Sequence, residues 1–259
     1  MSTRAAQAHV LPAGWHRSAV DGRRRTSVVV AKQLLRSIHD TGLRPGDPLP
    51  SEGALTQQLD IGRGSLREAL LILELNGFIT VRTGAKGGPV VSDGGAAAFG
   101  QMASMHFQHA KVELRELLQA RVALEPFVAR LAADLHDPGR TSELAAALEE
   151  SAVVDTSDSR AYIMCANRFH EEIAVLSGNK VLDLFGAAIL DLYESRLAGP
   201  LSAPQGRTRT MSDHIAIGQA IISGDGVRAE QLMRAHMDAM AEQIELRHTD
   251  LLSEVVQWF

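Results

Sequence analysis

The segment that most constrains the fold runs over residues 49–88, LPSEGALTQQLDIGRGSLREALLILELNGFITVRTGAKGG. Ser51 is a good N-cap for a short first helix, and Gly62 suits a turn that needs a positive φ. A second helix follows this turn, with apolar residues at helical spacing, and an Asn-Gly pair at 76–77 ends it. The order of helix, tight turn and second helix predicts a helix-turn-helix unit.

A two-stranded ribbon is expected directly after the second helix. Residues 78–82 alternate in polarity like a strand, and residues 89–91 supply the return strand. Glycines lie between the two. A helix-turn-helix followed by such a ribbon is a winged helix-turn-helix, which places its second helix in a DNA groove. The segment therefore predicts a domain that reads DNA.

The front of the second helix carries the residue types that contact DNA. Arg63 and Arg67 can pair bidentately with guanine O6 and N7, while Ser65 and the helix N-terminus suit phosphates. Lys86 at the wing tip is expected either to touch phosphate or the minor groove, or to be solvated. Residues 1–92 carry 12 Lys and Arg against 7 Asp and Glu, whereas residues 93–259 carry 14 against 24. A basic segment before an acidic one is consistent with a first domain that binds a polyanion and a second domain with a different function.

The motifs LPSE, GRGSLREAL and NGF, with the glycine-rich wing, resemble the GntR family of bacterial transcription regulators over residues 27–92. That family has an arginine that contacts DNA after the LPSE glutamate, and this chain has Gly53 there. The resemblance implies that the remaining contact positions are kept. The predicted DNA-binding residues are Ser51, Arg63, Gly64, Ser65, Arg67, Gly84 and Lys86.

Composition and the positions of linker-like segments predict two domains in a cytoplasmic protein. The single cysteine, Cys165, excludes an intrachain disulfide framework, and no apolar run approaches the roughly 20 residues of a membrane span. The expected divisions are a disordered arm at 1–26 with the cluster Arg23-Arg-Arg25, a winged helix-turn-helix at 27–92, a linker at 93–96, a helical domain at 97–248 and a tail at 249–259.

The second domain is expected to be an all-α bundle of six or seven helices, so the fold class is mainly α. Its sequence is rich in Ala and Leu and has little strand signal. Helices are predicted near 97–109, 111–136, 140–154, 158–177, 179–198, 206–223 and 225–248, separated by Gly, Pro and Ser breaks. This length is ample for a core with a central pocket.

Three histidines on three of these helices, His170, His214 and His236, could converge on one divalent ion such as zinc. Spacing alone does not establish convergence, and an ordinary surface or core histidine is the alternative for each. The other histidines of the bundle, His106, His109, His136 and His248, are expected to be of that ordinary kind.

The segments NRFHEEIAVLSGN, DHIAIGQAIISGD and AEQLMRAHM resemble the helical effector-binding domain of the FadR-type branch of the GntR family, known as the FCD domain. The resemblance implies metal ligation by His170, His214 and His236. An acidic residue or Asn is usual four positions before the first histidine, but this chain has Ala166 there and Asn167 one residue later. Either Asn167 is the fourth ligand, or three histidines hold the ion with water and effector, or the site is empty.

The resemblance further implies that Arg121 and Asn167 bind an effector carboxylate. An ion pair with Glu125 four residues on is an equal alternative for Arg121. We expect a homodimeric, ligand-responsive repressor of operator DNA, with zinc or nickel and a small carboxylate effector, and no membrane partner. A metal-free sensor of a fatty acid or acyl-CoA is the second possibility. A metal-dependent hydrolase with a DNA-binding module is the third, disfavoured because HExxH, P-loop and GxSxG motifs are all lacking.

Overall fold

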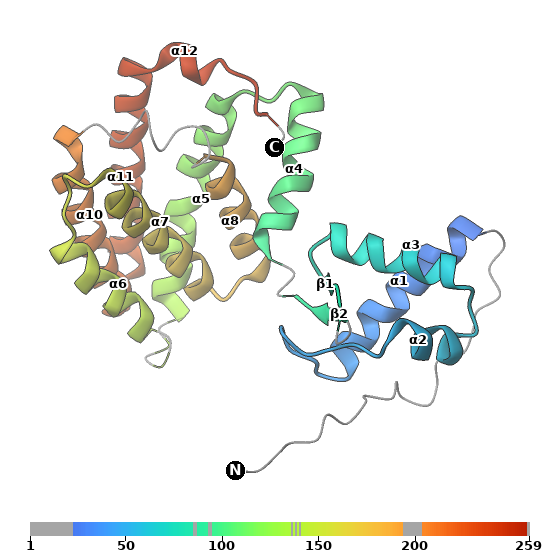
Figure 1. Ribbon diagram of the computed structural model, residues 1–259. Helices are drawn as coiled ribbons and strands as arrows, with labels where there is room; N and C mark the ends of the chain where they lie inside the picture. Colours follow the sequence, from blue (N-terminus) through green and yellow to red (C-terminus); the bar gives the residue numbers. More distant parts are fainter. Residues whose placement is uncertain are drawn as a thin grey trace. The chain divides into compact units, whose positions relative to one another are not determined.

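The computed structural model describes residues 23–84, 87–92, 95–135, 137, 139, 141–193 and 204–257. The chain divides into two compact units, 1–99 and 100–259. Figure 1 shows a small unit of helices with one ribbon and a larger unit of helices. Among the described residues, no helix combines the length and apolar character that a bilayer span needs.

The first unit begins with helix α1 (Arg23–Asp40), so the three arginines assigned to a disordered arm start a helix, and residues 1–22 lie outside the described part. Helices α2 (Glu52–Leu59) and α3 (Arg63–Leu75) follow, and then strands β1 (Ile79–Arg82) and β2 (Gly88–Val91). The strands pair antiparallel, with Ile79 opposite Val91 and Arg82 opposite Gly88. The predicted winged helix-turn-helix is thus the observed fold of this unit.

The turn between α2 and α3 differs from the expectation in one detail. The left-handed residue is Asp60, with φ 49°, whereas Gly62 has φ −70° and serves as the N-cap of α3. Asp tolerates this conformation better than most residues. Ser51 caps α2 as predicted, because its hydroxyl accepts a hydrogen bond from the backbone N–H of Ala54 at 3.3 Å. The core under these helices contains Leu34, Leu55, Leu66, Leu70 and Ile79.

The second unit is a helical bundle (Figure 1). Helix α4 (Ala96–Ala110) starts at the last residue of the expected linker and crosses the division between the units. The remaining described helices are α5 (Leu114–Leu135), α6 (Thr141–Val153), α7 (Ser159–Leu176), α8 (Lys180–Tyr193), α10 (Pro204–Ile222), α11 (Gly226–Arg247) and α12 (Thr249–Leu252). The expected end of α8 at 198 lies outside the described residues.

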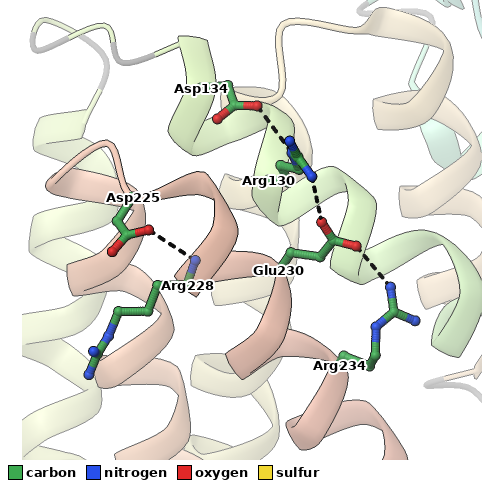
Figure 2. A network of polar contacts seen from close by, with 6 residues as sticks. All are labelled: Arg130, Asp134, Asp225, Arg228, Glu230 and Arg234. Atoms are coloured by element: carbon green, nitrogen blue, oxygen red, sulfur yellow. Dashed lines mark hydrogen bonds and ion pairs between the residues drawn. The ribbon is translucent and has the colours of Figure 1, made fainter.

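Helices α5 and α11 pack along each other and form the centre of the bundle. Their apolar faces share a core with α6, α7 and α10 that includes Phe169, Ile173, Ile217 and Met233. At one end a polar network joins the pair: Arg130 on α5 donates to Asp134 and to Glu230 of α11, which also accepts from Arg234 (Figure 2). These contacts are largely exposed and contribute little stability, so the apolar faces hold the pair together.

The C-terminal segment packs on the bundle, although the sequence suggested a tail. Leu252 and Val256 are buried. The backbone N–H of Leu114 donates to the carbonyl of Glu254, and that of Val256 to the carbonyl of Val112, each at 2.9 Å. Two apolar side chains, at positions 252 and 256, are too weak a sequence signal to predict this packing. The segment covers the start of α5, the helix that carries Arg121.

Candidate functional site

Five of the predicted DNA-binding residues lie at the starts of α2 and α3: Ser51, Arg63, Gly64, Ser65 and Arg67. Arg63, Gly64 and Arg67 are exposed at the front of α3, where Ser65 is half-buried. Arg67 Nε lies 3.3 Å from Glu52 Oε2 in an exposed ion pair with the start of α2. Exposed pairs of this kind are weak, so Arg67 can exchange Glu52 for a base or a phosphate at little cost. Ser51 is also exposed, although its hydroxyl serves as the helix cap.

The wing needs glycine for its geometry. Gly84 is exposed and has φ +107°, a conformation that side chains disfavour. At Gly87 a Cβ would lie 2.3 Å from the carbonyl oxygen of Arg82, so the returning chain passes too close for a side chain. Lys86, the predicted tip contact, lies outside the described residues.

The three candidate metal ligands come together inside the second unit. His170 on α7, His214 on α10 and His236 on α11 each offer one ring nitrogen, and these atoms lie within 4.8 Å of one another. His214 and His236 are buried, and their Nε2 atoms are 3.3 Å apart. Phe169 stacks on the His214 ring at a centroid distance of 4.0 Å and fixes its plane. Three helices that the sequence could only align by spacing therefore converge at one point.

Two carboxylates lie close to the Nδ1 atoms of His170 and His236. Glu125 Oε2 lies 2.5 Å from His170 Nδ1, and Asp213 Oδ2 lies 3.5 Å from His236 Nδ1. A carboxylate at Nδ1 fixes the ring orientation and leaves Nε2 for a metal, as is usual around metal-binding histidines. The sequence indicated Glu125 only as an alternative ion-pair partner of Arg121 and indicated no role for Asp213. The one sequence signal for Asp213 is its position directly before His214.

Burial sets the protonation of the cluster. Desolvation lowers the pKa of His214 well below its usual 6.5, and repulsion from His170, His236 and Arg121 adds to this. Desolvation also lowers the pKa of His170, although Glu125 opposes the shift. For Glu125, burial raises the pKa, but the charges of Arg121 and His170 outweigh it and leave the pKa below its usual value. Both shifts favour neutral imidazoles at His170 and His214, which is the form that binds metal.

The donor set fits a divalent transition metal. Imidazole nitrogens suit zinc, copper, nickel and iron. In a tetrahedral zinc site with Zn–N bonds of 2.0–2.1 Å, neighbouring nitrogens are about 3.3 Å apart. The 3.3 Å between His214 Nε2 and His236 Nε2 matches that edge, whereas the widest separation, 4.8 Å, exceeds it. Among the described residues, three buried polar atoms form no aligned hydrogen bond: His214 Nδ1, His170 Nδ1 and Glu125 Oε2. The 2.5 Å contact between Glu125 and His170 is therefore close in distance but is not aligned as a hydrogen bond.

Arg121 and Asn167, the predicted effector contacts, both line the cavity that opens beside the three histidines. Arg121 is buried and its Nε donates to Glu125 Oε1 at 2.5 Å, so the ion pair with Glu125 is formed. Glu125 thus links Arg121 to His170. Asn167 is half-buried, one turn before His170 on α7. The cavity contains about 970 Å³ of non-protein space, part of it open to solvent, and His248 also lines it.

The placement of the other bundle histidines varies. His106 and His109 are exposed on α4, as expected for ordinary surface residues. His248 instead borders the cavity, and His136 lies outside the described residues.

Comparison with known proteins accounts for both units. Residues 26–86 match the family of bacterial regulatory proteins called gntR, and residues 116–239 match the FCD domain. The HTH-type transcriptional regulator Rv0494 of Mycobacterium tuberculosis is 29% identical over 230 residues, which cover 88% of this chain and 93% of the relative. The HTH-type transcriptional repressor NanR of Enterobacter sp. (strain 638) is 26% identical over 223 residues, covering 85% of each chain.

A solved structure supports the fold. The Streptococcus agalactiae GntR structure aligns with a TM-score of 0.66 at 23% identity and covers 83% of this chain and 99% of its own. The matched domains are those of a DNA-binding transcription regulator and not of an enzyme, so the hydrolase alternative falls. The chain belongs to the GntR family of bacterial transcription regulators, with an N-terminal winged helix-turn-helix and a C-terminal FCD domain of the FadR-type branch.

Proposed function

We propose that the protein is a homodimeric repressor that leaves its operator when a small carboxylate binds beside a divalent metal in the helical domain. The observation that carries this proposal is the convergence of His170, His214 and His236 at the inner end of a cavity. Three clustered histidines, two of them buried, offer ring nitrogens to a ligand that enters this cavity. A relative that is named as a repressor, NanR, supports the sign of the regulation.

We propose different binding roles for the residues around the cluster. Neutral His214 and the two carboxylate-oriented rings of His170 and His236 would hold the ion, and Asn167 is the candidate for a further ligand. A bound divalent ion supplies an open coordination position for a carboxylate oxygen. Arg121, held in place by Glu125, would donate to the same carboxylate.

The charged side chains in this cavity favour the carboxylate over the alternative fatty acid or acyl-CoA, although apolar residues such as Ile163, Met240 and Ile244 also line it. Arg121, Arg209 and Arg247 line it, together with Gln243 and four histidines. An acyl chain would leave these groups without partners after removal from water. A short polar acid can pair with them.

The DNA-binding and effector-binding roles are proposed for separate domains, 27–92 and 97–248. Two winged domains in a dimer would bind the half-sites of a palindrome. Effector binding would then change the relative populations of two dimer arrangements, and the coupling would be reciprocal.

The experiment begins with selection of binding sites from a random double-stranded DNA pool by the full-length protein. A palindromic site is expected. Binding to this site is then measured with zinc present and small acids added one at a time, and some of these acids should weaken it. His214→Ala should still bind the site but lose the response. An enriched site without two-fold symmetry would contradict the dimer, and a compound that acts equally on wild type and His214→Ala would contradict the metal-anchored effector site.

A further inference from the structure

The residues that line the cavity beside the histidines extend along α10 and α11. On α11 the lining residues His236, Met240, Gln243 and Arg247 follow one another at helical spacing and form a stripe. Eleven residues separate His236 from Arg247, which is about 16 Å along the helix. Arg209 lies five residues before His214 on α10, or about 7 Å along its axis.

Both arginines lie toward the same end of the cavity. Helices α10 and α11 are joined by the short turn at 223–225, so they run antiparallel, and residues before His214 lie level with residues after His236. The cavity therefore has an inner end at the histidines and Arg121, and an outer end at Arg209, Arg247 and His248.

The charges at the two ends are arranged differently. Arg121 at the inner end is paired with Glu125. At the outer end Arg209 has only a loose contact with Asp213, at 4.0 Å, and its side chain is 72% exposed. Arg247 has no acidic partner within ion-pair distance among the described residues.

Asp213 is the sole acidic residue among the described residues that line this cavity, and its carboxylate also faces His236. Among the described residues that line this cavity, the outer end therefore has more basic than acidic side chains. Clefts lined by one sign of charge concentrate ligands of the opposite sign.

We infer that the effector carries two anionic groups, one bound at the histidines and Arg121 and the second bound between Arg209 and Arg247. This inference rests on the proposed function of the cavity and specifies its ligand class as a short dicarboxylate. Along the helices, Arg209 lies about 7 Å and Arg247 about 16 Å from the level of the histidines. The nearer level suits two carboxylates joined by a few methylene groups, and the long side chain of Arg247 has to reach back along α11 toward the second carboxylate. Arginine is the side chain best suited to hold such a carboxylate, because its planar fork binds both oxygens.

The test is a titration of the full-length, zinc-loaded protein with acids matched in chain length. Adipate is compared with hexanoate, and glutarate with pentanoate, at constant ionic strength because the difference is electrostatic. The expected result is that the dicarboxylate of each pair binds about tenfold more tightly. Equal affinities within each pair, or no binding by any of the four acids, would overturn the inference.

Variants locate the second anion. In Arg209→Gln and Arg247→Gln the advantage of adipate should shrink several-fold, and in the double variant it should disappear, while the affinity for hexanoate stays the same. Arg228→Gln is the matched control, because Arg228 is exposed near the opposite end of α11 and does not line the cavity. A preference for adipate that survives in the double variant would overturn the assignment of the outer site.

The metal-anchored site and the outer site fail in different ways. If His214→Ala retains full affinity for hexanoate, the proposed anchor at the histidines is wrong, whatever the arginine variants show. If His214→Ala loses affinity for all four acids while wild type binds mono- and dicarboxylates equally, the proposed function stands and the second anionic group is wrong.

Discussion

Glu125 Oε2 lies 2.5 Å from His170 Nδ1, while the other oxygen of the same carboxylate accepts from Arg121. One half-buried carboxylate therefore contacts both a candidate metal ligand and the candidate effector contact. The pairing links the two halves of the proposed site, because a change at Glu125 acts on the metal and on the carboxylate together.

Replacement of Glu125 by glutamine should weaken metal binding about 10- to 100-fold, because His170 loses the charge that orients its ring and raises its basicity. The measurement is a competition titration with a zinc chelator on the folded protein. Glu172→Gln is the control, since Glu172 is on α7 but pairs with Arg168 at 3.9 Å. Unchanged zinc affinity in Glu125→Gln would show that the Glu125–His170 pair does not support a metal.

The metal-free protein should become less stable as the pH falls from about 7 to 5. Burial lowers the pKa of His214 and of His170 in the folded protein, so the unfolded chain binds more protons below its own histidine pKa of about 6.5. Stability is therefore present above that pH and is lost below it, at up to about 1 kcal/mol per pH unit for each such histidine. Urea unfolding with a chelator present measures this slope.

His214→Gln should flatten this slope, whereas His106→Gln, at an exposed position on α4, should leave it unchanged. A slope that is equally steep in His214→Gln would contradict the assignment of the depressed pKa to that residue.

The sequence predicted those parts of the fold that depend on local signals. Ser51 capped α2 where expected, and Gly-, Pro- and Ser-containing breaks marked the bundle helices to within a few residues. The left-handed residue in the turn is Asp60 and not Gly62, as the sequence had suggested. Both residue types tolerate that conformation, so the choice between them depends on packing.

The non-local parts of the site were beyond the sequence. Three histidines in family motifs indicated a metal site, but their convergence depends on how α7, α10 and α11 pack. The contact between Glu125 and His170 joins α5 to α7, and no repeating pattern in the sequence indicates a contact between two separate helices. The C-terminal segment was treated as a tail because two apolar residues, Leu252 and Val256, gave too weak a pattern.

Arg67→Ala should cost about 1–3 kcal/mol of operator binding and relax sequence preference at one base pair of each half-site, because it removes an arginine from the front of α3. Binding is measured at fixed salt concentration, and Arg228→Ala in the helical domain is the control. Uniform weakening on all sequences, with a smaller salt dependence, would instead make Arg67 a phosphate contact. Unchanged affinity and preference would remove it from the interface.

Gly218→Ala should destabilise the helical domain by about 1–3 kcal/mol through overpacking. A Cβ at Gly218 would lie 2.5 Å from Cδ2 and 3.0 Å from Cγ of the buried Leu148, so α6 and α10 cannot keep their distance. At Gly53 a Cβ meets nothing within 4 Å, so Gly53→Ala is the matched control and should be neutral or stabilising. Equal unfolding free energies for wild type and Gly218→Ala would contradict the close packing of α10, the helix that carries His214.

Native mass spectrometry of the full-length protein with zinc, compared between wild type and His214→Ala, tests the central claim most directly. If the three histidines bind the metal, the wild type is a dimer with one zinc per chain. The His214→Ala protein is then a dimer without zinc that still binds the selected operator, because the winged domain does not contain the metal ligands. A wild-type protein that holds no metal, or a His214→Ala protein that keeps it, would contradict the metal-anchored mechanism.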